Sequence, residues 1–146
     1  MYVLNTAEWI SLVSALATVG GVGVVWYQTG NISKQLKLQN FSDYTKRYQE
    51  IILHFPEDIN NPQFVLTGRK DYNITMRYMR AYFDICYEEW YLHSHNLLDD
   101  ETWTAWQSGM KTAFSKPAFK QAWEIVRKDS QFGSKFENFM AGLVDA

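Results

Sequence analysis

The chain has 146 residues, a formal net charge of -2 and a single cysteine, Cys86. The slightly acidic balance excludes a generally basic nucleic-acid-binding protein, so no DNA partner is expected. One cysteine excludes a framework of internal disulfides. Aromatic residues make up 16% of the chain. Because large rings bury much apolar area per residue, we expect an aromatic core, with interface or membrane-surface contacts as the alternative.

The first predicted element is a membrane-spanning helix. Residues 9–33 carry no charged side chain. As a helix rising about 1.5 Å per residue, the apolar part from Ile10 to Tyr27 would cover roughly 27 Å, close to the hydrocarbon thickness of a bilayer. Trp9 at one end and Trp26 with Tyr27 at the other stand where amphipathic rings prefer to lie, at the membrane–water interfaces. The pattern predicts one span, with the lipid bilayer as a partner.

Two other interpretations of this run stay open. A cleavable signal peptide would carry Lys or Arg ahead of the apolar run, whereas residues 1–8 hold one acid and no base. The sequence Ala15-Leu16-Ala17 is nonetheless an acceptable cleavage pattern. A buried helix of a soluble protein is the second alternative, because glycines interrupt the run.

The distribution of basic residues predicts the topology. Lys34, Lys37, Lys46 and Arg47 all follow the apolar run, and none precedes it. By the positive-inside rule the N-terminus lies outside and the rest lies in the cytoplasm. We expect a lead and transmembrane helix over residues 1–30 and one cytosolic domain over residues 31–146.

A row of small residues lies within the predicted span. Ser14, Ala17, Thr18 and Gly21 recur at helical spacing. Such rows let two helix backbones approach closely in lipid, although small residues are also common in spans that do not associate. We therefore expect a homo-oligomer or a larger membrane complex, with these four residues as candidates for self-association.

After the predicted span the sequence is amphipathic, and prolines then interrupt it. Residues 30–55 have apolar side chains near one face, which predicts that the span continues as a helix into the cytosol. Pro56 and Pro62 should end it, since proline lacks a donor and biases the preceding residue away from helix. A loop to about residue 71 follows, with residues 64–66 expected to pack on the core.

Four further helices are predicted, and the starts of the first three are assigned from residues that accept hydrogen bonds from free helix N–H groups. They are a central helix over 72–95 capped by Asp71 or Asn73, a helix capped by Asp99 or Asp100 and reaching 114, a helix from Pro117 to 128 capped by Ser115, and a short helix over 136–143 after a break at 132–134. No stretch alternates as a strand would. The domain is expected to be all-α, with about five helices.

One basic cluster is a candidate anion site. It comprises Arg69, Lys70, Tyr72, Arg77, Tyr78 and Arg80, around a loop and a helix start. Helix N-termini offer free N–H groups, arginine forks bind phosphate oxygens and tyrosine faces can stack on bases. A nucleotide or another phosphorylated ligand is the possible partner. The alternative is a solvated patch or contact with anionic lipid headgroups.

Metal and catalytic chemistry have little to support them. Cys86, Glu89 and His93 share a face of the predicted 72–95 helix, but no recognised metal motif is present. The alternative is that Cys86 packs as a small apolar residue while Glu89 pairs with His93 at the helix surface. With no nucleophile elbow and three histidines, we expect no enzyme, no cofactor, no metal and no catalytic residue.

One resemblance to known proteins rests on residues 82–92, 98–103, Trp106, Gly109, Met110, 117–119 and Trp123. In these segments the chain resembles a group of uncharacterised small bacterial single-pass membrane proteins with a C-terminal aromatic-rich helical domain. The resemblance implies a bacterial source, with the span in the inner membrane, and an all-α cytosolic domain, and it implies no activity. In architecture alone, the chain is also similar to membrane effectors of prokaryotic antiviral defence.

Two functions from different classes follow. The first is a membrane-anchored, non-enzymatic interaction domain, either self-assembling or an accessory subunit of a membrane complex. It is motivated by the aromatic excess and the small-residue row. The alternative is an antiviral membrane effector whose cytosolic domain senses a nucleotide or another phosphorylated ligand.

Overall fold

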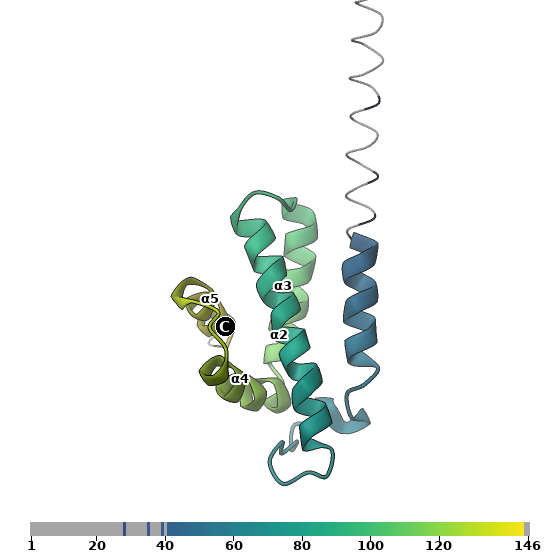
Figure 1. Ribbon diagram of the computed structural model, residues 1–146, viewed down its shortest axis with the longest axis vertical. Coiled ribbons are helices and arrows are strands. Elements are labelled where there is room, and N and C mark those ends of the chain that lie inside the picture. The colour runs from purple at the N-terminus through teal and green to yellow at the C-terminus, as the bar shows by residue number, and fades with distance from the viewer. Residues whose placement is uncertain (1–27, 29–34, 36–38, 40, 145–146) are drawn as a thin grey trace, which may run out of the picture. The chain divides into compact units, whose positions relative to one another are not determined.

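The computed structural model describes residues 28, 35, 39 and 41–144 (Figure 1). The chain divides into two compact units, Met1–Tyr44 and Thr45–Ala146. In the first unit every described residue is helical. The predicted span over 9–33 lies outside the described residues, except for Gln28, which is exposed. Within the described part of the chain, no helix has both the length and the apolar character needed to cross a membrane.

The second unit is built from helices. Its first helical segment is residues 45–52, part of a helical run over 41–52. A 3-10 helix and four α-helices follow, which are η1 (Glu57–Asn60), α2 (Tyr72–Ser94), α3 (Asp100–Phe114), α4 (Pro117–Asp129) and α5 (Ser134–Val144). No strand occurs among the residues that the structure describes. The predicted all-α class is therefore confirmed.

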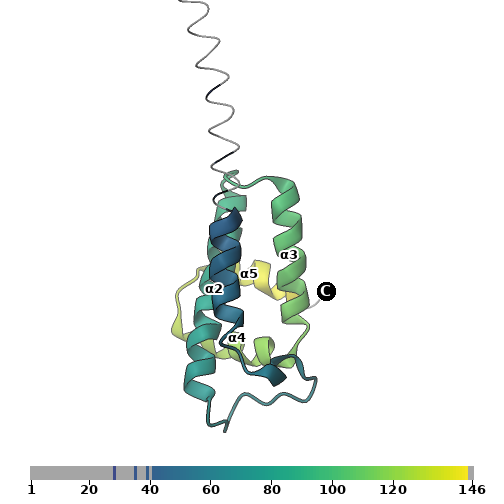
Figure 2. The ribbon, with the colours of Figure 1, turned by 90° about the vertical axis from the view of Figure 1, so that its right-hand side faces the viewer.

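The helices pack around α2 and α3. These two run side by side in opposite directions, and α4 lies across the end where α2 begins (Figure 1). Helix α5 packs on α3, and η1 packs on α4. Figure 2 shows residues 45–52 running alongside α2. An ion pair between Arg47 and Glu88 joins these two helices.

Local chemistry sets the helix ends. The helix over 45–52 stops just before Pro56, as proline requires. Asp99 caps α3, because its carboxylate accepts a hydrogen bond from the Thr102 amide at 2.9 Å. Pro117 lies in the first turn of α4, where its missing donor has no intrahelical partner to lose. Gly133, with φ +85°, makes the turn before α5. These four boundaries were predicted from the sequence.

One predicted cap, Ser115, is wrong, and another, Asp71, is confirmed in position only. The Ser115 hydroxyl donates to the Thr112 carbonyl at 2.7 Å, in the last turn of α3, and Lys116 takes the N-cap position of α4. Asp71 holds the N-cap position of α2 but makes no capping bond, because its carboxylate accepts from Arg69 instead. In both cases a neighbouring partner outcompetes the free N–H groups of the helix.

The loop before α2 also differs in part from expectation. It contains η1, which the proline pattern did not predict. Phe64 and Leu66 are buried as expected, but Val65 between them is 58% exposed. Extended backbone places successive side chains on opposite sides, so only two of the three can reach the core.

Aromatic rings fill the core. Phe83, Phe114 and Phe136 have no exposed surface. The Trp123 ring lies 5.2 Å from the Phe83 ring and 5.9 Å from the Phe136 ring, both in edge contacts. Such pairs contribute about 0.5–1.5 kcal/mol each beyond the area they bury. Core packing is therefore a main role of the aromatic excess.

Candidate functional site

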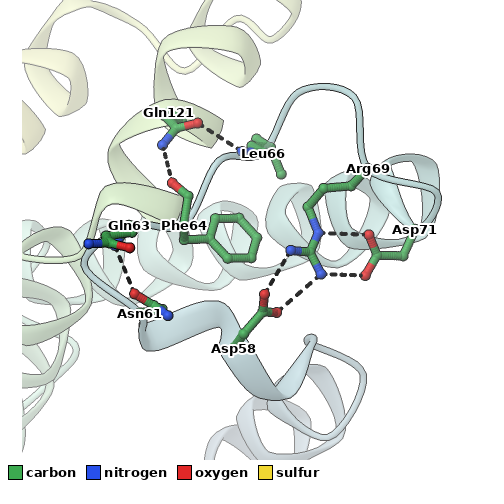
Figure 3. A network of polar contacts seen from close by, with 8 residues as sticks. All are labelled: Asp58, Asn61, Gln63, Phe64, Leu66, Arg69, Asp71 and Gln121. Carbon is green, nitrogen blue, oxygen red and sulfur yellow. Dashed lines mark hydrogen bonds and ion pairs between the residues drawn. The ribbon is translucent and has the colours of Figure 1, made fainter.

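Arg69, the first residue of the predicted anion site, lies between two carboxylates. Its guanidinium donates to Asp71 at 2.8 and 3.0 Å and to Asp58 of η1 at 2.8 and 3.1 Å (Figure 3). The Phe64 ring centroid is 4.6 Å from its Cζ. Four of the five N–H donors of the fork are therefore used. Hydrogen bonds to Asp71 and Asp58 raise the pKa of Arg69, and the same contact lowers the pKa of Asp71.

The other residues of that cluster do not converge on one place. Arg80 pairs with Asp129 of α4 at 3.1 Å. Tyr78 stacks on His54, with ring centroids 4.3 Å apart. Tyr72 is half-buried, and Lys70 and Arg77 are exposed without an ion pair to any described residue. Anion binding stays a prediction, and only Lys70 and Arg77 keep unpaired charge for it.

The loop beside Arg69 is fixed by one side chain of α4. The Gln121 amide donates to the Phe64 carbonyl at 2.9 Å and accepts from the Leu66 N–H at 2.9 Å (Figure 3). A side-chain amide thus replaces the backbone partner that a strand would have supplied. Together with Arg69, it makes this region a structural junction.

The predicted metal candidates are separated by their environments. Among the described residues, no three His, Cys, Asp or Glu side chains converge as a metal site would need. Cys86 is buried, and burial raises the pKa of its thiol, which leaves it a poor nucleophile. His93 stacks on Trp103, 4.4 Å between centroids and 5° between planes. Glu89 is 8% exposed, so the alternative that places it at the helix surface is wrong.

The described residues do enclose one groove of ligand-binding size. It has a cavity volume of about 710 Å³ and lies between residues 47–54 and α2, within the range of roughly 300–1,000 Å³ typical of ligand sites. Its lining comprises Arg47, Glu50, Ile51, His54, Tyr78, Ala81, Asp84, Ile85, Tyr87 and Glu88. Ile51 and Ile85 are buried and form an apolar floor.

Polar contacts close the groove at its two ends. At one end, Arg47 binds Glu88 through two hydrogen bonds of 2.7 and 3.1 Å. At the other, His54 stacks on Tyr78, and its Nδ1 lies 2.7 Å from the Glu50 carbonyl oxygen. Because a carbonyl only accepts, Nδ1 carries the proton.

The charges in the groove do not balance. Arg47 faces three carboxylates, those of Glu50, Asp84 and Glu88. The side chains of Glu50 and Asp84 make no hydrogen bond or ion pair with a described residue. Partial burial, and then the charge of Glu88, raises the pKa of Asp84, which Arg47 opposes.

This groove is difficult to predict from the sequence. Its two walls are separated in sequence by residues 55–77, which include η1 and the start of α2. The available signals were the helical spacing of Asp84 and Glu88 and that of Arg47 and Glu50. Both spacings are equally typical of a solvated helix surface.

A second surface feature lies on the helix over 45–52. Tyr48 and Ile52 are 38% and 40% exposed, and Leu53, just beyond the helix, is 82% exposed. With Thr45, the helical residues Tyr48 and Ile52 follow a spacing of three and four, which places them on one side of the helix. We call Thr45, Tyr48 and Ile52 the stem row.

Comparison of the chain with protein-family models, with curated proteins and with solved structures finds no match. Function is therefore inferred from the described residues and the sequence pattern.

Proposed function

We propose that the chain is a membrane-anchored, non-enzymatic interaction domain that self-associates through the helix following its span. The observation that supports this most directly is the stem row, in which Ile52 is 40% exposed and Tyr48 is 38% exposed although its ring also contacts that of Tyr82. Exposed apolar side chains gathered on one helix face commonly mark an interaction site.

A second copy of the chain is the occupant that fits best. Spacings of three and four residues are those of the a and d positions of a coiled coil. By sequence spacing the row would continue to Phe41, which is also exposed. Two copies anchored by N-terminal spans would present their stem helices in parallel, and the small-residue row from Ser14 to Gly21 would add contact within the bilayer.

The experiment is a measurement of oligomer mass in mild detergent. Ile52→Lys should shift the chain towards monomer, because it places a charge in the seam. Ser108→Lys, at an exposed position of α3, adds the same charge elsewhere and should leave the mass unchanged. Gly21→Leu tests the predicted contact within the span. An unchanged mass for Ile52→Lys contradicts self-association, and a monomeric parent would instead favour an accessory subunit of a larger complex.

The proposed topology has its own test. A reporter fused after residue 146 should be active only if it works in the cytoplasm, since the positive-inside rule places the helical domain there. The chain should also stay with the membrane fraction after carbonate extraction. Periplasmic reporter activity, or release by carbonate, contradicts the anchor.

A further inference from the structure

The groove beside α2 has the dimensions of a helix-binding site. Its walls are residues 47–54 and residues 78–88, and at about 1.5 Å per residue they run for roughly 10 and 15 Å. This length matches two to three turns of a third helix. Helix-in-groove recognition uses apolar side chains at i, i+3 or i+4, and i+7, and the Ile51 and Ile85 floor would receive them.

The charge of the groove specifies what else the occupant should carry. One guanidinium and three carboxylates leave two negative charges when His54 is neutral. Glu88 already has Arg47 as a partner, whereas Glu50 and Asp84 have none among the described residues. Glu50 lines one wall and Asp84 the other, and a charge-assisted hydrogen bond to either carboxylate is stronger than a neutral one.

We propose that this groove binds a short amphipathic helix of a partner protein that carries an Arg or Lys beside its apolar row. The cation lies between Glu50 and Asp84, and the apolar residues cover Ile51, Ala81 and Ile85. This goes beyond self-association, because at 3.6 residues per turn Ile52 of the stem row lies about 160° around the helix from Glu50 of the groove.

The probe is a fluorescent, capped amphipathic peptide of about three turns, with leucines one turn apart and a single Arg beside them. It is titrated against the full chain in lipid nanodiscs, and its fluorescence anisotropy is measured with empty nanodiscs as the blank. A matched peptide with Gln in place of Arg should bind at least about tenfold more weakly, since a hydrogen bond to a charged group typically changes affinity by this much or more.

Variants of the chain locate the binding. Glu50→Gln with Asp84→Asn should weaken the Arg peptide at least about tenfold, whereas Glu101→Gln, an exposed acid outside the groove, should not. Ala81→Leu fills the floor without changing charge and should also weaken binding. If the double variant loses its helical circular dichroism signal, it is not folded, and the binding measured for Ala81→Leu then tests the proposal. Ile52→Lys should bind the peptide as the parent does, which separates this result from self-association.

Several outcomes would overturn the proposal. They are failure of the Arg peptide to bind, equal binding of the Gln peptide, binding that survives both the double variant and Ala81→Leu, and binding to empty nanodiscs alone. A competition experiment adds one more outcome. If spermine displaces the Arg peptide at concentrations at which the Gln peptide does not, the groove binds small cations by charge alone, and the proposal is overturned.

Discussion

Replacing Glu89 with glutamine should make the protein more stable near neutral pH. Glu89 is 8% exposed, and its carboxyl group makes no hydrogen bond with a described residue. Burial, and then the neighbouring charge of Glu88, raises its pKa from 4.5 to about 8, although Arg47 opposes the shift. Tyr48 of the stem row and the Cys86 thiol lie close to it, and the charge of Glu89 raises the pKa of each. The folded chain therefore holds Glu89 as a neutral acid at pH 7.

The sign of the pH dependence follows from proton binding. Between pH 4.5 and about 8 the folded chain holds a proton on Glu89 that the unfolded chain has released. Stability from this group therefore falls as pH rises, by about 1.4 kcal/mol per pH unit. Over the interval from pH 4.5 to pH 7 the loss is at most about 3 kcal/mol. Glutamine keeps the shape of the neutral acid and does not ionise, so Glu89→Gln should recover most of that loss at pH 7 and little at pH 4.5.

The assay is urea unfolding of the full chain in detergent, followed by tryptophan fluorescence at both pH values. Glu101→Gln, which removes an exposed acid, should change the free energy of unfolding by no more than about 0.5 kcal/mol at either pH. The reasoning is refuted if Glu89→Gln is less stable than the parent at pH 7. That result would mean that Glu89 is ionised in the folded chain and stabilised by Arg47.

Three further predictions concern single sites. Gln121→Ala leaves the Phe64 carbonyl and the Leu66 N–H without their partner, and should lower the free energy of unfolding by about 1–3 kcal/mol; an unchanged urea midpoint would mean that water replaces the amide. Cys86, buried and with a raised thiol pKa, should react with a thiol reagent about a hundredfold more slowly in the folded chain than in urea. Gly68→Ala should cost about 1 kcal/mol, because Gly68 has φ +82° while nothing stands within 4 Å of an added Cβ; a gain in thermal midpoint would contradict this.

Element boundaries could be predicted where a single residue decides them. Asp99, Pro117 and Gly133 act within one turn of their own position, through a cap, a missing donor and a positive φ. Ser115 failed as a predicted cap because its hydroxyl bonds to the preceding helix instead. When a hydroxyl has two partners within reach, the sequence does not say which it will choose.

The candidate sites were less predictable, because their properties depend on residues distant in the chain. Arg69 and Arg80 looked available beside one another, but their carboxylate partners Asp58 and Asp129 stand 11 and 49 residues away. For the acids of the groove the error runs the other way. The sequence indicates that Asp84 is an ordinary surface residue, and only the packing of residues 45–52 against α2 makes it part of a groove. Charge pairing across a fold is set by tertiary packing, which the spacing of residues within one helix does not encode.

The shortness of α5 has a consequence for how the protein is made. Helix α5 has 11 residues, fewer than the roughly 12–15 that an isolated helix needs to be stable in water. Its Phe136 is fully buried and lies against Tyr87 and Trp90 of α2 and Trp123 of α4. During synthesis these rings leave the ribosome before Phe136 does, and they stay open to water until α5 docks. A newly made chain is therefore most prone to aggregate in the interval before α5 docks.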